Sequence, residues 1–363
     1  MVATEEDLWI PAKRLAAAAR ALQPTLMRLV AARADRISGA LEADYAMVPW
    51  DREQLIGQLQ RQLVDLAEAR FSVCGGATAH VRERRSQPLE AIPRAWRWLR
   101  EGRRVYVDAE SGACAEALDL LAEMGEVLGF GVLTTSREGV SAPEGAVDGG
   151  VDPARARVAF VSSQADEELA AYVLARACLR RSGVDPRAVH VAIVCGDGKK
   201  LGRILRRLWF SVRFSDAKDH GAFAGPVPDD VVVSLESAVE SLEARSEVEC
   251  WVPLRRLEGG LTMRGTLMAP SLWATTSGVS REDLEEIVNL FPSVGPALLI
   301  VECEDETSGE ALLADMVRKG FGWTLIGSRG VDEASRGVDA PLRVFDGALL
   351  EERLPPGLPK PRP

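Results

Sequence analysis

The sequence is poor in the residues that build metal sites and disulfide frameworks. Its 363 residues include only three histidines, which lie far apart in the chain. The six cysteines form no C-x-x-C pair and occur at scattered positions: Cys74, Cys114, Cys178, Cys195, Cys250 and Cys303. Zinc sites need closely spaced Cys and His ligands, and small secreted domains need dense cysteines. We therefore expect no metal site and a set of reduced, mostly buried thiols.

The sequence also lacks the features of membrane, secreted and nucleic-acid-binding proteins. No apolar run approaches the roughly 18 residues that cross a bilayer. Met1, Val2 and Ala3 are followed by acidic residues, so the start does not have the basic segment of a secretory signal. The formal net charge is -10, which disfavours nonspecific binding to nucleic acid and to anionic membranes. These absences predict a cytoplasmic protein without nucleic-acid or membrane partners.

Most of the chain alternates between helical and strand patterns. Residues 10–70 carry apolar side chains at three- and four-residue steps and predict helices, interrupted at Pro49 and Trp50. Further along, the predicted strands are 104–108, 131–134, 158–162, 189–195, 298–301 and 323–327. The predicted helices between them are 94–100, 114–128, 166–181, 199–209, 231–244 and 310–319. This rhythm is typical of parallel strands joined by crossover helices.

Four segments carry motifs in a recognisable order. They are the helix and strand around Gly-Arg-Arg-Val-Tyr-Val at 102–107, Asp-Gly-Gly at 148–150 with the helix start at 166–171, the turn Ser-Gly-Val-Asp-Pro at 182–186, and Ser-Val-Gly-Pro-Ala-Leu at 293–298. Their order and spacing resemble the aldehyde dehydrogenase superfamily. The corresponding family motifs read GNTVVLKPSE, ELGGKxP, GQxC and EEVFGPVL, and none is intact in this chain.

The resemblance implies an α/β, aldehyde dehydrogenase-like fold. We expect a reduced Rossmann-like domain and an α/β catalytic-type domain with a parallel sheet. Residues 1–148 would form an N-terminal helical region and a truncated cofactor-type domain, and residues 149–330 the catalytic-type domain. Residues 331–363 would form a C-terminal extension with a Pro-rich tail. A Gly-, Pro- and Ser-rich linker is expected at 137–153.

The catalytic positions that the resemblance assigns are degenerate. Aldehyde oxidation through a thiohemiacetal needs an anionic sulfur nucleophile. The family's nucleophilic cysteine falls on Pro186, which has no nucleophilic atom. The glutamate that serves as general base falls on Val147, and the neighbouring Asp148 is expected in a turn. In the turn that supplies the oxyanion donor, Gln87 is the nearest amide, and we expect it to be solvated.

Two cysteines are alternative thiol candidates. Cys178 lies in a predicted helix beside Arg176 and Arg180, so it could be a displaced nucleophile, but a buried helix cysteine usually acts as a small hydrophobe. Cys195 ends a predicted strand before a Gly-rich turn. A cysteine at the end of a strand is more readily exposed than one inside a helix, although a core position is again the simpler interpretation for Cys195.

The cofactor positions are degenerate in the same way. The family's lysine that contacts the adenosine ribose falls on Asp108, and its glutamate for the nicotinamide ribose falls on Pro292. The interval between the strand at 131–134 and Gly149 is too short for a strand, turn and helix that seat a pyrophosphate. We therefore expect no cofactor, with NAD or NADP as the expectation if the chain is active. The Gly-Asp-Gly-Lys-Lys turn at 196–200 lacks the spacing of a phosphate-binding loop.

Three hypotheses follow. The first is a pseudoenzyme that has lost its nucleophile, base and cofactor residues and has a structural role or binds a protein partner or its own copies. The second is an active NAD(P)-dependent aldehyde or acyl-CoA oxidoreductase that uses a relocated cysteine. The third is a binding module of unrelated α/β fold.

Overall fold

The computed structural model describes residues 12–129, 131–136, 146–148, 155–258, 265–276, 278–319, 321–326 and 344–345. The chain divides into two compact units. Unit 1 comprises Met1–Tyr45 and Arg52–Asp152, and unit 2 comprises Ala46–Asp51 and Pro153–Pro363. The short segment 46–51 therefore belongs to unit 2, although it lies between two helical stretches of unit 1 in the sequence.

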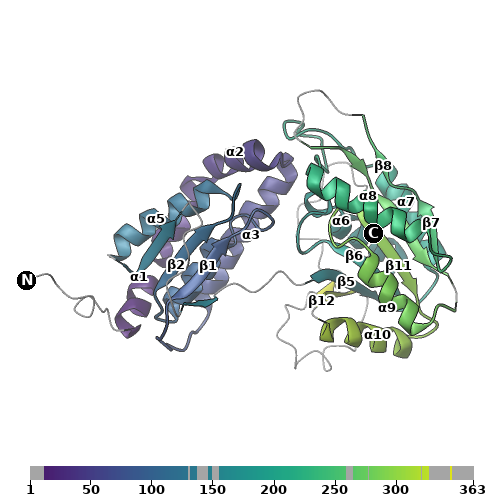
Figure 1. Cartoon of the computed structure of the whole chain (residues 1–363). Helices are drawn as coiled ribbons and strands as arrows, with labels where there is room; N and C mark the ends of the chain where they lie inside the picture. Colours follow the sequence, from purple (N-terminus) through teal and green to yellow (C-terminus); the bar gives the residue numbers. More distant parts are fainter. Residues whose placement is uncertain are drawn as a thin grey trace, which may run out of the picture. The chain divides into compact units, whose positions relative to one another are not determined.

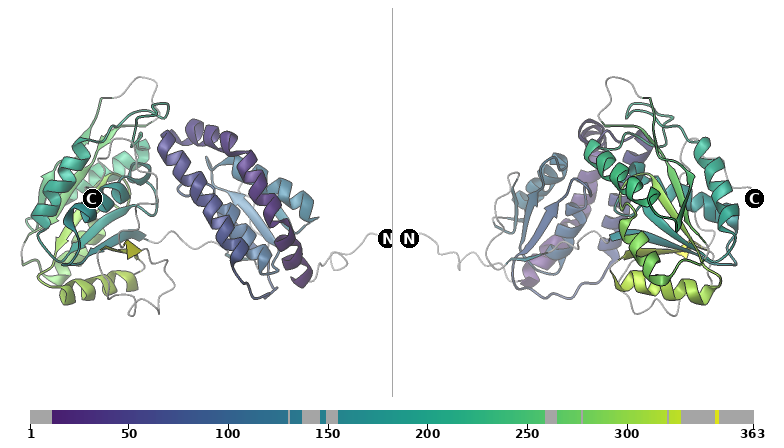
Figure 2. Two further views of the ribbon diagram at one scale, coloured as in Figure 1. Left: turned by 180° about the vertical axis from the view of Figure 1, so that it is seen from behind. Right: turned by 45° about the vertical axis from the view of Figure 1, so that its right-hand side comes forward.

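Unit 1 contains a four-stranded parallel sheet in the order β3-β2-β1-β4. Its strands are β1 (Ala79–Glu83), β2 (Val105–Ala109), β3 (Leu133–Ser136) and β4 (Val147–Asp148). Its helices are α1 (Ala12–Ala32), α2 (Ala34–Tyr45), α4 (Ala91–Arg100), α5 (Ala115–Leu128) and α3 (Pro49–Glu68), of which the first three residues belong to unit 2. Figures 1 and 2 show α1 and α3 on the same side of the sheet.

The two faces of this sheet differ in polarity. Val81 and Val107 are paired in register and fully buried, while His80 and Arg82 alternate with them on β1. Helix α4 packs on β1 and β2, α5 packs on β3, and α1 contacts both helices. Among the described helices, those that contact the sheet thus cover its apolar face. The opposite face carries polar side chains.

Unit 2 contains a seven-stranded sheet in the order β13-β12-β5-β6-β11-β10-β7. All neighbouring pairs are parallel except β10 and β7. The strands are β5 (Arg155–Val161), β6 (Val189–Val194), β7 (Val248–Val252), β10 (Ser271–Thr275), β11 (Ala297–Glu302), β12 (Phe321–Ile326) and β13 (Val344–Phe345). A separate antiparallel pair is formed by β8 (Arg255–Arg256) and β9 (Met268–Ala269).

Helices cover both faces of this sheet. One buried cluster joins the sheet to α6 (Glu167–Cys178) and α7 (Gly198–Phe210). The second joins the other face to α8 (Asp229–Glu243), α9 (Arg281–Leu290) and α10 (Glu306–Arg318). Successive residues of β5 alternate between the two clusters, with Ala159 in the first and Phe160 in the second. Figure 1 shows α8, α9 and α10 in front of the sheet.

The predicted alternation of strands and helices is confirmed, and the α/β class with parallel sheets is correct. One helix, α9, was not predicted, nor were the three five-residue strands β1, β7 and β10 and the four two-residue strands β4, β8, β9 and β13. Strand β1 reads Ala-His-Val-Arg-Glu, so its polar residues hid the strand pattern. The expectation that Asp148 lies in a turn is wrong, because it forms β4, where it is the backbone partner of His80. The rest of the predicted linker, except residues 146 and 147, lies outside the described residues.

Candidate functional site

The segment that carries the predicted nucleophile position is a left-handed turn. Helix α6 ends at Cys178, and a short 3-10 turn over Arg180–Gly183 follows it. Arg181, Ser182 and Gly183 have φ values of 46°, 56° and 81°. Consecutive non-glycine residues in this region are strained unless their surroundings hold them. The predicted helix over 166–181 therefore ends early.

Hydrogen bonds from three other parts of unit 2 hold this turn. Oδ1 of Asp51 accepts a hydrogen bond from the backbone N–H of Arg181 at 3.1 Å. The hydroxyl of Ser182 donates to the Gly225 carbonyl at 2.7 Å and accepts from the Gly225 N–H at 2.9 Å. The N–H of Gly295 donates to the Gly183 carbonyl at 2.9 Å. The turn is thus fixed by groups that lie far away in the sequence.

The electrostatics of the turn centre on Asp51. Burial raises the pKa of this carboxyl to about 7, against the lowering effect of the Arg181 N–H bond and the Arg181 guanidinium. Asp185 also raises this pKa, and its Oδ1 accepts a bond from the backbone N–H of Arg187 at 2.8 Å. Pro186 lies between these residues in the sequence and is partly exposed. Its own side chain supplies neither a nucleophile nor a proton carrier.

The two thiol candidates are both buried. Cys178 has an exposed fraction of 0%, and burial raises the pKa of its thiol far above the ordinary value. Cys195 is 4% exposed, and burial, together with nearby acidic groups and Cys303, raises the pKa of its thiol to about 12. The simpler interpretation, a core position for each of these two cysteines, is therefore confirmed. The Sγ of Cys195 lies 3.6 Å from the Asp305 carbonyl, because α10 covers the end of β6.

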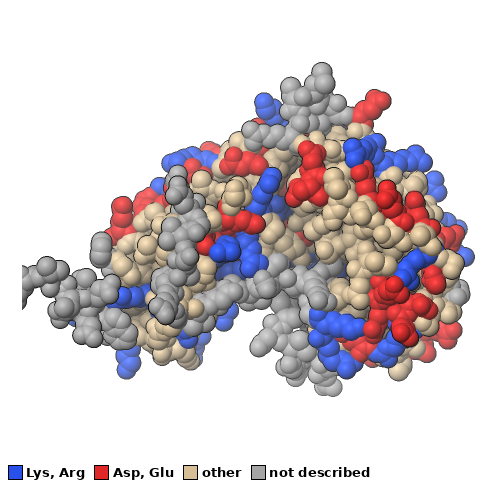
Figure 3. Space-filling view, viewed as in Figure 1, with Lys and Arg blue, Asp and Glu red and all other residues tan. Residues whose placement is uncertain are grey.

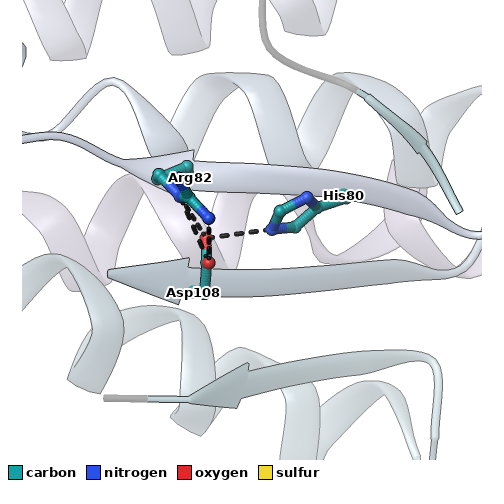
Figure 4. A network of polar contacts seen from close by, with 3 residues as sticks. All are labelled: His80, Arg82 and Asp108. Carbon is teal, nitrogen blue, oxygen red and sulfur yellow. Dashed lines mark hydrogen bonds and ion pairs between the residues drawn. The ribbon is translucent and has the colours of Figure 1, made fainter. Parts of the chain in front are cut away.

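Asp108, the residue at the predicted ribose-contacting position, is the centre of a polar network on the polar face of the unit 1 sheet (Figure 4). Nε and Nη2 of Arg82 donate to its carboxylate at 2.9–3.2 Å. Nε2 of His80 lies 3.0 Å from Oδ1. Burial opposes the charged form of Asp108, but the bonds from Arg82 and His80 outweigh it and hold its pKa below the ordinary value. Both carboxylate oxygens thus already have protein partners.

The network joins Asp108 to two residues that the sequence analysis did not single out, His80 and Arg82. Arg82 and Asp108 are paired in register between β1 and β2, and His80 lies two residues before Arg82 on the same face. The His80 ring also lies against Tyr106, with ring centroids 5.7 Å apart. The alternation of His80 and Arg82 with buried Ala79 and Val81 was a possible signal, but it requires β1 to be recognised first.

The other predicted positions lie in structural surroundings. Pro292 is buried directly after the end of α9, and Val147 is the backbone partner of Ala79 in the sheet. Gln87 is not simply solvated, because its Oε1 accepts a hydrogen bond from Arg94 at 3.1 Å. Asp197 caps α7, with Oδ1 accepting from the Lys200 N–H at 2.8 Å. The turn at 196–200 is therefore a capped strand-to-helix connection.

Two further observations concern the described residues as a group. They include no set of three or more His, Cys, Asp or Glu side chains arranged to hold a metal ion. Within the same part of the chain, none of the helices is both long and apolar enough to cross a membrane.

The buried carboxylate of the network has a measurable role in stability. Replacing Asp108 by asparagine is expected to lower the free energy of unfolding at pH 7 by about 1–3 kcal/mol, because the Arg82 and His80 groups lose a charged acceptor. Since the folded-state pKa is lowered, the stabilisation is present above the ordinary pKa of 3.8 and is lost as the pH falls through the folded-state value. Urea denaturation at pH 7 and pH 3 measures the difference.

Arg82→Gln is the matched control for this experiment. The Arg82 side chain is 52% exposed, so its loss is expected to cost less than about 1 kcal/mol. If Asp108→Asn and Arg82→Gln lowered the free energy of unfolding equally, the buried carboxylate would not be the dominant group of the network.

Comparison with known proteins places the fold. No protein-family model and no curated protein sequence matches this chain. Solved structures do match. An NAD-dependent benzaldehyde dehydrogenase from Corynebacterium glutamicum has a TM-score of 0.67 and 16% identity, covering 92% of this chain and 81% of its own. A putative methylmalonate-semialdehyde dehydrogenase from Sinorhizobium meliloti 1021, complexed with NAD, has a TM-score of 0.68 and 16% identity, covering 96% and 80%.

A third structure is similar to the same extent. Lactaldehyde dehydrogenase from Escherichia coli has a TM-score of 0.66 and 14% identity, covering 92% of this chain and 79% of its own. These identities are too low to transfer an activity, but the coverage includes both units. The resemblance seen in the sequence is thus confirmed for the fold, and the chain has the fold of the aldehyde dehydrogenases.

Proposed function

We propose that this chain is a pseudoenzyme with the aldehyde dehydrogenase fold, acting as a structural or partner-binding protein. The observation that carries the proposal is the combination of Pro186 at the nucleophile position with the burial of both alternative thiols. A thiol attacks a carbonyl carbon only as an accessible thiolate. The raised pKa values of Cys178 and Cys195 keep these sulfurs protonated at neutral pH.

The surroundings of Pro186 support the same proposal. The turn before it is held by hydrogen bonds with Asp51, Gly225 and Gly295. Ser182 is 4% exposed, and its hydroxyl both donates to and accepts from Gly225. A serine hydroxyl engaged in this way is poorly suited to replace the missing cysteine, because attack would break both hydrogen bonds.

The residues present do not fit a nicotinamide dinucleotide. A lysine-like donor is replaced by Asp108, whose oxygens are engaged by Arg82 and His80. Strand β3 ends at Ser136 and β4 begins at Val147, which leaves ten residues, 137–146, for the connection. A crossover between parallel strands that contains a helix needs about a dozen residues or more. A helix N-terminus for the pyrophosphate is therefore difficult to build in this interval.

The direct test combines binding and turnover. The purified chain is titrated with NAD and NADP in a thermal-shift assay, because a ligand that binds the native state raises the unfolding temperature. It is then incubated with either cofactor and a panel of aliphatic and aromatic aldehydes, with and without coenzyme A, while absorbance follows reduced nicotinamide. We expect no thermal shift and no reduction. Saturable stabilisation with turnover would refute the proposal.

The alternative function is an active NAD(P)-dependent aldehyde or acyl-CoA oxidoreductase that uses a relocated cysteine. It predicts an acyl adduct on Cys178 or Cys195, detectable by mass spectrometry, and loss of turnover in Cys178→Ser or Cys195→Ser. Cys74 and Cys250 are exposed, so labelling by iodoacetamide is expected at these two cysteines first. Their labelling therefore does not count in favour of the alternative.

A further inference from the structure

Two surface helices of unit 2 carry opposite charges. Helix α7 contains five Lys or Arg residues and no acidic residue: Lys199, Lys200, Arg203, Arg206 and Arg207. Helix α8 contains five Asp or Glu residues and no basic residue: Asp229, Asp230, Glu236, Glu240 and Glu243. For a protein whose formal net charge is -10, α7 is a marked local exception. These two helices lie on opposite faces of the same sheet.

Most of these charges have no ion-pair partner within the part of the chain that the structure describes. Lys200 pairs with Glu167, and Glu236 pairs with Arg256. The remaining charged residues of the two helices are exposed and make no ion pair in the described ranges. We call the exposed Lys199, Arg203, Arg206, Arg207 and Phe210 the basic face, and the exposed Asp230, Val233, Glu240 and Glu243 the acidic face. Figure 3, seen from the same side as Figure 1, shows acidic side chains in the region where Figure 1 labels α8.

Each face also contains an exposed apolar side chain. Phe210 is 76% exposed and Val233 is 65% exposed, the two largest exposed fractions among large hydrophobic residues in the described ranges. The guanidinium of Arg206 stacks on the Phe210 ring with 5.6 Å to its centroid. Aromatic residues and Arg are both enriched in protein interfaces, so the exposed Phe210 ring beside Arg206 fits a contact surface.

The spacing of the two faces is complementary when the helices run antiparallel. If Phe210 lies against Val233, then Arg203, seven residues earlier on α7, lies opposite Glu240, seven residues later on α8. By the same count, Lys199 reaches the level of Ala244, next to Glu243. This direction also brings the positive N-terminus of α7 to the negative C-terminus of α8. Both the charges and the helix dipoles then favour the contact.

We propose that the basic face of one copy of this chain binds the acidic face of a second copy. Because the two faces differ and lie on opposite sides of the sheet, the contact is heterologous, and repeated contacts build rings or open chains rather than closed dimers. A contact between two helices of about 20 Å length buries much less than the ~800 Å² per partner of a stable interface. The association is therefore weak and depends on salt. This inference does not depend on whether the chain is catalytic.

Sedimentation equilibrium of the full chain tests the proposal. At 50 mM salt, the wild-type chain is expected to associate with increasing protein concentration, and 500 mM salt is expected to weaken the association at least about fivefold. Arg203→Glu and Glu240→Arg should each weaken association at low salt by a similar factor. Arg61→Glu and Glu126→Arg, exposed positions in unit 1, make the same changes in net charge and serve as controls that should behave as wild type.

Mixing the two charge-reversal variants gives the sharpest result. Each variant keeps one native face, and its reversed face is complementary to the reversed face of the other variant. An equimolar mixture is therefore expected to associate more strongly than either variant alone, and the double variant Arg203→Glu/Glu240→Arg should also recover association. Circular dichroism checks folding, and Arg203→Gln and Glu240→Gln replace any reversal that unfolds the chain.

Three outcomes would overturn the proposal: no association of the wild type at low salt, association that both reversals leave unchanged, or a mixture that stays monomeric. If the basic face binds an unrelated polyanion instead, the wild type would stay monomeric alone, which counts against the proposal in the same way.

Discussion

Replacement of Gly183 by alanine is expected to lower the free energy of unfolding of unit 2 by about 4 kcal/mol or more, a loss seen only for severe backbone or core defects. Gly183 has a φ of 81°, where an alanine side chain costs about 1–2 kcal/mol. An added Cβ would also overlap the backbone carbonyl of Gly295, whose own N–H donates to Gly183. Neither backbone segment can move without breaking this bond.

Differential scanning calorimetry measures the effect. For a domain of this size, a loss of 4 kcal/mol corresponds to a decrease in melting temperature of about 8 °C or more. Gly196→Ala is the matched control, because a Cβ at that position meets nothing within 4 Å and its φ is not positive. A melting temperature of Gly183→Ala within about 2 °C of that of wild type would show that the left-handed turn is not tightly held.

The second large effect is a loss of stability as the pH rises, caused by Glu83. This side chain is fully buried at the end of β1, where its Oε1 and Oε2 accept hydrogen bonds from the N–H groups of Leu89 and Ala91 at the start of α4. Burial raises its pKa from 4.5 to about 8, against the lowering effect of these two bonds. The difference between these two pKa values corresponds to a change of at most about 5 kcal/mol in the free energy of unfolding.

The sign follows from the protons bound in each state. Below pH 4.5 the carboxyl is protonated in both the folded and the unfolded chain. Between pH 4.5 and about 8 the unfolded chain ionises first, so the free energy of the unfolded state falls relative to that of the folded state, and stability falls. Above pH 8 both states are ionised and the loss is complete. Asp51, with its pKa raised to about 7, acts in the same direction.

Urea denaturation of wild type and Glu83→Gln at several pH values between 5 and 9 checks this prediction. The variant is expected to be less stable at pH 5, because its amide cannot accept both backbone bonds, but to lose less stability than wild type as the pH rises. Glu126→Gln, at an exposed position, should leave the wild-type pH dependence unchanged. If the free energy of unfolding fell equally with pH in wild type and Glu83→Gln, the pH dependence could not be assigned to Glu83.

Local sequence patterns were sufficient for most of the fold. The apolar residues of α5 and α7 recur with helical spacing, and the strands β5, β6 and β11 consist mainly of β-branched or other apolar residues. Such strands are buried on both faces, so their composition identifies them without any neighbour. Strand β1 is different because only one of its faces is covered by the described helices, and its alternate residues His80 and Arg82 are polar.

For the candidate site, the sequence predicted only which residues differ from those that the family resemblance calls for. That Pro186 cannot attack a carbonyl carbon follows from its chemistry alone, and this required only the alignment of one turn. The sequence indicated a core position for Cys195 but not the residues that cover it, because these lie at the start of α10, more than a hundred positions later. The contact of Asp51 with Arg181 spans 130 positions.

The sequence by itself thus determined the order of most strands and helices, the family that the chain resembles, and the presence of Pro186 where that resemblance places the nucleophile. These depend on residue type and on spacing within a few turns or strands. Only the tertiary structure decided which thiols are buried, that His80 and Arg82 engage Asp108, and that Asp51, Gly225 and Gly295 hold the turn before Pro186. Such contacts depend on strand register and on which helix covers which face, and these are fixed by interactions between segments that are distant in the chain.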